Sequence, residues 1–118
     1  MNIYWKNTVS SGSFTSATSW VHGVVPGPAD VAEVTTSGAT AFVLSPDTVL
    51  GLNVVSGAVV TTESDLTLTE GTATGANRGL LRVAGEGGAG ELNFGGTFNN
   101  PGRIHRRHDK RPDVRRYA

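Results

Sequence analysis

Two carboxylates, Glu63 and Asp65, have a type and spacing that suggest chemistry. On a strand, side chains two residues apart point to the same face, and paired carboxylates can divide acid and base work when their environments separate their pKa values. Their neighbours are threonine and serine, so we expect both acids in a solvated turn. Arg78 and Arg82 are the cations that a polysaccharide-cleaving site would need, but no spacing places them beside the pair. We therefore predict no catalytic residue and a non-enzymatic protein.

Two aromatic residues, Trp5 and Trp20, are candidates for stacking on a sugar ring. They lie in a segment rich in serine turns, followed by Pro26 and Pro28, which forbid a regular strand there. A stack of strands exposes apolar core and unpaired backbone at its end, and so needs a cap. We predict that the two rings plug that end, and we keep sugar contact by Trp5, Trp20, Glu63 or Asp65 as the alternative.

A glycine-rich turn at 85–90 matches the pattern G-x-G-x-x-G. The dinucleotide motif requires a helix to begin at the last glycine, and the continuation ELNFGG does not form one. The same stretch resembles a calcium-binding repeat, but Leu92 stands where that repeat has an aspartate. We therefore predict neither a cofactor nor a metal ion.

The charge of the chain is divided unevenly, with a net −5 over residues 1–102 and +5 over residues 103–118. We expect 103–118 to be a disordered tail outside the fold, of the kind that a reading-frame change or a truncated gene leaves. The weaker alternative is an anionic surface or nucleic acid bound through phosphate contacts. The residues that would make these contacts are Arg106, Arg107, Lys110, Arg111, Arg115 and Arg116. His105 and His108 do not suggest a metal site, because arginines lie between them.

The elements that must position these residues are short strands. Sixteen glycines and many valines and threonines favour strands joined by tight bends, and no window sustains the periodicity of a helix. Apolar residues alternate with polar ones at 30–36, 40–44, 50–54, 66–69, 81–83 and 92–94. There is no cysteine to form a disulfide. Stability must therefore come from packing and backbone pairing.

These strands recur at short, irregular intervals, and each interval contains a small polar turn. The steps run from Leu52 to Leu66, from Leu66 to Leu81 and from Leu81 to Leu92. Such a repeat is typical of a β-solenoid, in which each rung buries its face against its neighbours. A β-sandwich gives similar spacing and remains the alternative.

The division of the chain follows from this pattern. We predict a cap at 1–29, solenoid rungs at 30–102 and the tail at 103–118. The predicted inner stack comprises Leu50, Leu52, Val54, Leu66, Leu68, Leu81, Val83, Leu92 and Phe94.

The opening segment resembles the β-helical passenger domains of bacterial autotransporters and large surface adhesins. The resemblance lies in W-K-N at 5–7, S-G-S-F at 11–14, Ser19-Trp20, Pro26-Gly27 and D-V-A at 30–32. The later phrases GLNV at 51–54, SGA at 56–58 and FGGTFNNPG at 94–102 are similar to rungs of those proteins. The resemblance implies a right-handed parallel β-helix that is exported to the cell surface, with this chain as an N-terminal piece.

The first functional hypothesis is accordingly a structural or adhesive module of an exported bacterial surface protein. Its partners would be glycans or proteins of host or cell surfaces, with self-association through the open end of the solenoid. The alternative is a carbohydrate-binding or polysaccharide-degrading β-helix, and we do not expect nucleic acid as a partner. Residues 1–10 lack the apolar core of a signal peptide, and no segment reaches the ~20 apolar residues of a membrane span.

Overall fold

The computed structural model describes residues 1–73, 75–83 and 90–106. Within these ranges the chain is all-β, with short strands and two single 3-10 turns. No helix in the described part has the length and apolarity needed to cross a membrane. The strands are β1 (Asn2–Tyr4), β2 (Ser11–Ser13), β3 (Val31–Val34), β4 (Thr40–Val43), β5 (Asp47–Val49), β6 (Gly51–Val54), β7 (Val59–Thr62), β8 (Leu66–Leu68), β9 (Leu80–Val83), β10 (Leu92–Phe94) and β11 (Arg103–Arg106), and the turns are η1 (Ala17–Ser19) and η2 (Val21–Gly23).

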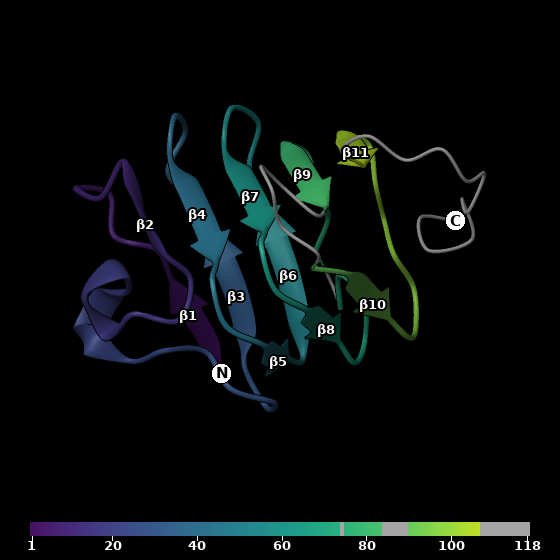
Figure 1. The fold of residues 1–118 in the computed structure, drawn as a ribbon, viewed down its shortest axis with the longest axis horizontal. Helices are drawn as coiled ribbons and strands as arrows, with labels where there is room; N and C mark the ends of the chain where they lie inside the picture. Colours follow the sequence, from purple (N-terminus) through teal and green to yellow (C-terminus); the bar gives the residue numbers. More distant parts are fainter. Residues whose placement is uncertain (74, 84–89, 107–118) are drawn as a thin grey trace.

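The strands form three sheets, ordered β1-β3-β6, β2-β4-β7-β9-β11 and β5-β8-β10. In Figure 1 the strands of the five-stranded sheet follow one another across the molecule, from β2 near the N-terminal end to β11. Every pairing between these strands is parallel. The β-sandwich alternative does not fit this arrangement, because its sheets are antiparallel.

Strands that are neighbours in the sequence do not pair with each other. The chain leaves one sheet, passes through another and returns before it pairs: between β4 and β7 it forms β5 and β6, which belong to the other two sheets. Leu52 and Leu66, which recur in the sequence as neighbouring strands, lie in different sheets. Leu52 instead lies beside Ala32, and Leu66 beside Leu92.

The three sheets enclose one apolar core, and each sheet contributes the side chains on the inner face of its strands. In the five-stranded sheet Ala41 lies beside Val60 and Val60 beside Leu81, and all three are fully buried. Parallel neighbours require a turn of the chain between them. Stacked glycines at one corner provide such turns, since Gly38 and Gly57 both have φ of +89° and the Gly38 N–H donates to the Gly57 carbonyl at 2.9 Å.

The predicted inner stack is correct except at two positions. Leu50 is only half-buried, because β5 ends at Val49 and the chain bends there before β6 begins. Val49 takes the inward position and is fully buried. Phe94 is half-buried and packs against the edge of the core with Phe98. The strand predicted over 50–54 is therefore β6, which begins one residue later, at Gly51.

Both predicted boundaries also shift. Residues 1–29 are more than a cap, because β1 pairs with β3 and β2 pairs with β4. Residues 103–106 are not a tail, because β11 pairs with β9 in register, with Ile104 beside Leu81. Neither β2, with the sequence Ser-Gly-Ser, nor β11 shows the alternation that identifies a strand in the sequence. Their pairing partners, rather than their own composition, make them strands.

Candidate functional site

The two tryptophans form a closed aromatic cluster at the N-terminal end. Trp5 and Trp20 are 2% and 0% exposed, and their ring centroids lie 5.1 Å apart at 83°. The Trp5 indole N–H donates to the Val9 carbonyl at 2.7 Å, and that of Trp20 to the Phe14 carbonyl at 2.8 Å. Neither ring has an exposed face on which a sugar could stack. The ligand-contact role considered for them is not supported, and their burial favours the capping role.

Glu63 and Asp65 lie in the bend between β7 and β8, and so do not share the face of a strand. The Asp65 carboxylate accepts a hydrogen bond from the Glu91 N–H at 3.0 Å, and the Glu63 N–H donates to the Val43 carbonyl at 2.9 Å. The premise that Glu63 and Asp65 point to the same face of a strand is therefore wrong. Asp65 is exposed, as a solvated turn requires.

The predicted anion-binding tail falls almost entirely outside the described residues. Arg106 is the last residue of β11, whereas Arg107, Lys110, Arg111, Arg115 and Arg116 lie outside the described part. The glycine-rich turn at 85–90 lies outside it too, apart from Gly90. Over 1–73, 75–83 and 90–106, no three His, Asp or Glu side chains gather as metal ligands would.

A buried carboxylate that the sequence did not single out lies on the outer face of β3. Glu33 is 6% exposed and accepts hydrogen bonds from the side-chain amides of Asn2 at 2.7 Å and Asn53 at 2.9 Å. The Asn53 amide is itself oriented, because its oxygen accepts the Ala76 N–H at 2.7 Å. The three hydrogen-bonded side chains come from β1, β3 and β6, three neighbouring strands of one sheet. They form an amide ladder across that sheet.

The position beside this ladder must be a glycine. A Cβ placed on Gly75 would overlap the Asn53 side-chain oxygen, so any larger residue would displace the amide that holds Glu33. Burying a charge is costly unless it is paired or hydrogen-bonded. No ion pair to Glu33 is found among the described residues. The amide ladder is therefore what stabilises this carboxylate.

Glu33 and Asn53 line a hollow of about 300 Å³ on the surface. The other polar residues around it are Thr35, Arg78 and Asn99, all exposed at its rim. The hollow thus combines a carboxylate that only accepts hydrogen bonds, a guanidinium that only donates them, and amide and hydroxyl groups that do both. Such a lining suits a polar ligand with many hydrogen-bonding groups.

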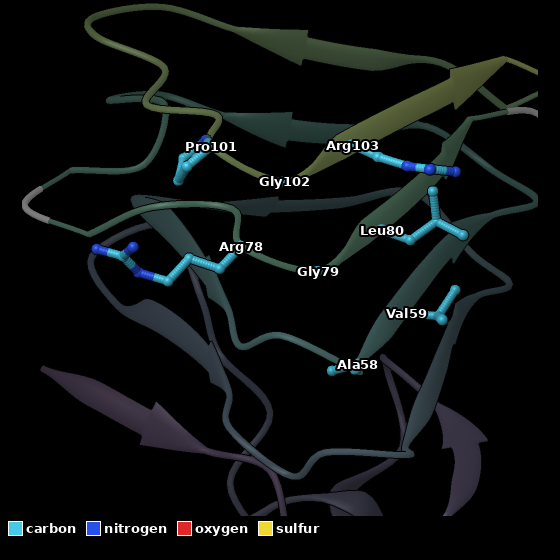
Figure 2. Close-up of a pocket in the computed structure, with 9 residues that line it drawn as sticks. Ala58, Val59, Arg78, Gly79, Leu80, Pro101, Gly102 and Arg103 are labelled. Atoms are coloured by element: carbon cyan, nitrogen blue, oxygen red, sulfur yellow. The ribbon is translucent and has the colours of Figure 1, made fainter.

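Arg78 also lines a second hollow, of about 430 Å³, at the corner where the chain enters β9 and β11. Its other lining residues include Gly79, Pro101, Gly102 and Arg103, and none is acidic. Figure 2 shows the Arg78 and Arg103 side chains extending in opposite directions from the stacked Gly79 and Gly102 backbones. The two hollows share Arg78 and are adjacent.

The backbones approach one another closely at this corner because its residues are glycines. A Cβ on Gly102 would overlap the Gly79 carbonyl oxygen, and one on Gly79 would overlap the Ala58 carbonyl oxygen. In the sequence Arg78 stands out only by its charge, and nothing singles out Glu33 or Asn53. Asn53 lies in a phrase that looks like ordinary strand sequence, so pairing register alone brings it beside Glu33.

Comparison of the chain with protein-family models, with curated proteins and with solved structures finds no match. The site is therefore interpreted from its own geometry.

Proposed function

We propose that the three sheets are the faces of a right-handed parallel β-helix, and that this helix is a non-enzymatic structural and adhesive module of an exported bacterial surface protein. The observation that carries the proposal is that three sheets, each made of parallel strands, enclose one core. Between successive strands of the five-stranded sheet the chain always passes through another sheet, as expected if it winds around the core. The resemblance of the opening segment to adhesin passenger domains points the same way.

The outer faces of such a coil suit adhesion, because they present polar groups at regular strand spacing. The outer face of the β1-β3-β6 sheet carries Glu33 and Asn53 side by side. The two hollows lie at the adjoining corner. Glycans or proteins of another surface are the partners proposed for these faces. The last strands, β10 and β11, each have one unpaired edge among the described residues, which would permit self-association.

The proposal is tested with the purified full chain coupled to beads. We expect these beads to bind glycan-coated or matrix-protein-coated surfaces above the level of albumin-coated beads. Beads carrying Leu68→Asp, which places a charge at a fully buried position, should lose the binding, because the fold cannot bury an unpaired charge. Binding no better than that of albumin beads on every surface would overturn the adhesive role.

A second measurement tests the non-enzymatic part. The chain is incubated with a panel of acidic and neutral polysaccharides, and new reducing ends are quantified. We expect none above the Leu68→Asp control. Reproducible release by the wild-type chain alone would show the polysaccharide-degrading alternative to be correct instead.

A further inference from the structure

Glu33 holds acceptor capacity that the fold does not use. A carboxylate offers about four lone-pair sites, and the amides of Asn2 and Asn53 occupy two of them, one on each oxygen. The carboxylate is 6% exposed, yet it lines the 300 Å³ hollow. The ladder itself requires two acceptor oxygens, because a neutral amide would offer one oxygen and turn its NH2 group toward the second donor. The remaining acceptor sites are available to a ligand that donates hydrogen bonds.

The lining of this hollow selects among classes of ligand. Phosphate is disfavoured because Glu33 would repel it, and a metal cation because Arg78 would. An apolar ligand would cover the unused acceptor sites of Glu33 and the Asn99 side chain without forming hydrogen bonds to them. A sugar ring suits the carboxylate and the amides, since neighbouring hydroxyls donate to Glu33 while their oxygens accept from the side-chain amides.

The second hollow adds a preference for negative charge. Arg78 and Arg103 line it, both exposed, and no carboxylate does. Neither arginine makes an ion pair with another described residue. Guanidinium groups bind carboxylates and sulfates through charge-assisted hydrogen bonds, so the acidic group of a ligand belongs at this end of the groove.

We propose that the two hollows form one binding groove for an acidic oligosaccharide, with ring hydroxyls on Glu33 and an acidic substituent on Arg78. Arg103 then contacts the acidic group of the next sugar unit. This inference rests on the adhesive function proposed above and deepens it, by naming the class of ligand and the residues that bind it.

The test is isothermal titration of the full chain with three trisaccharides of one linkage: a hexuronate, its carboxyl-reduced counterpart and a sulfated form. We expect the hexuronate or the sulfated form to bind about tenfold more tightly than the reduced form, the gain of one charge-assisted hydrogen bond. The better of the two acidic probes identifies the substituent. Equal affinity for all three, or binding of none, would overturn the proposal.

Two variants test the assignment of residues, with one matched control. Arg78→Gln should lower affinity for the acidic probe about tenfold and leave that for the reduced probe little changed. Arg82→Gln removes the same charge from β9 outside both hollows and should change affinity less than about twofold at physiological ionic strength. Equal losses in both would show non-specific charge attraction and overturn the groove.

Glu33→Gln tests the hydroxyl contacts, and should weaken binding of all three trisaccharides alike. Thermal melting of this variant checks that the amide ladder still folds. Thr35→Ala, at the exposed rim, gives a second reading that does not disturb the ladder, and should weaken binding about threefold, as loss of one neutral hydrogen bond does. Unchanged affinity in both would overturn the role of the first hollow.

The adhesive function and this inference can fail separately. If beads bearing Arg78→Gln and Glu33→Gln adhere as well as wild-type beads, the groove is wrong and the adhesive module stands. If wild-type beads adhere to nothing, the adhesive module is wrong, and the titration alone decides whether the groove binds sugar.

Discussion

The first and the last described strands border the apolar core in different ways. At the N-terminal end Trp5, Phe14 and Trp20 are buried, with neighbouring ring centroids 5.1 Å apart and edge-to-face geometry. At the other end Phe94 and Phe98 stack at 4.7 Å, but both remain half-buried. The N-terminal cluster closes the core, whereas the later pair covers only one edge of it.

The size of the core side chains changes along the five-stranded sheet. One inward row of the five-stranded sheet grows in size from the first strand to the last. In order, its residues are Gly12, Ala41, Val60, Leu81 and Ile104. A Cβ on Gly12 would lie 2.8 Å from the Ser19 hydroxyl and 3.6 Å from the Trp5 ring. The cap therefore occupies volume that side chains of the row fill further along.

The largest expected effect is that of Trp20→Ala, which removes a fully buried indole ring from the N-terminal cluster. Loss of a fully buried large side chain costs about 3–5 kcal/mol of unfolding free energy, and the Phe14 carbonyl also loses its donor. Phe98→Ala, at a half-buried ring, should cost less than half as much. Urea titration with linear extrapolation measures both. Similar losses would show that the two ends are closed equally well.

The second prediction follows the same row toward its end. Leu81→Ala removes a fully buried side chain and should cost about 2–5 kcal/mol. Ile104→Ala, one strand further on and half-buried, should cost clearly less. The same titration gives both values. A larger loss at Ile104 would mean that the core is most tightly packed at its last described strand, and that the N-terminal end is not the better enclosed one.

Much of this fold is visible in the sequence, because inward residues alternate with outward ones. The alternation predicts that Leu66, Leu68, Leu81 and Val83 face inward, and all four are fully buried. It does not predict the rung length, because alternation identifies strands without saying which strands pair. In a parallel stack the partner strand lies a whole turn of the chain away, and the corners between strands look alike in sequence.

The candidate site was harder to predict, for a related reason. Glu33 lies in the middle of VAEV, where it looks like an ordinary outward residue of a strand. Its burial comes from Asn2 and Asn53, which are distant from it in the chain and beside it in the sheet. Trp5 and Trp20 stand out because large aromatic residues are rare in this chain. Residue type identifies core positions such as Trp5 and Trp20, whereas the register between strands brings Glu33 and Asn53 together.

The third prediction concerns a buried polar side chain near the later strands. Asn77 bridges to Val54 in the parallel direction, yet it is fully buried. Its amide donates to the Asn100 side-chain oxygen at 2.7 Å and to the Arg103 carbonyl at 2.9 Å. Asn77→Ala should cost about 1–3 kcal/mol, because the fully buried amide gives up two hydrogen bonds.

The matched control for Asn77 is Asn93→Ala, an exposed asparagine on β10. Its expected cost is within about 0.5 kcal/mol, measured by the same urea titration. A similar small cost for Asn77→Ala would show that the hydrogen bonds of this side chain contribute little to the free energy of unfolding. The two ends would then differ only in their aromatic residues.

The smallest expected effect concerns Asp47, at the start of the edge strand β5 on the N-terminal side of its sheet. Burial raises the pKa of its carboxyl above the ordinary value, and the hydrogen bond from the Thr48 N–H offsets part of that rise. One carboxylate oxygen is buried without a hydrogen-bond partner. Because the folded pKa is the higher one, the stability that protonated Asp47 contributes is fully present below the unfolded pKa and is lost as pH rises through the folded pKa.

Asp47→Asn removes this charge. The variant should therefore melt at a slightly higher temperature than the wild type at pH 7, and at about the same temperature at pH 3, where the wild-type carboxyl is protonated. Asp65→Asn makes the same charge change at an exposed site, and should shift the melting temperature equally little at both pH values. A lower melting temperature for Asp47→Asn at pH 7 would mean that the ionised carboxylate stabilises this edge.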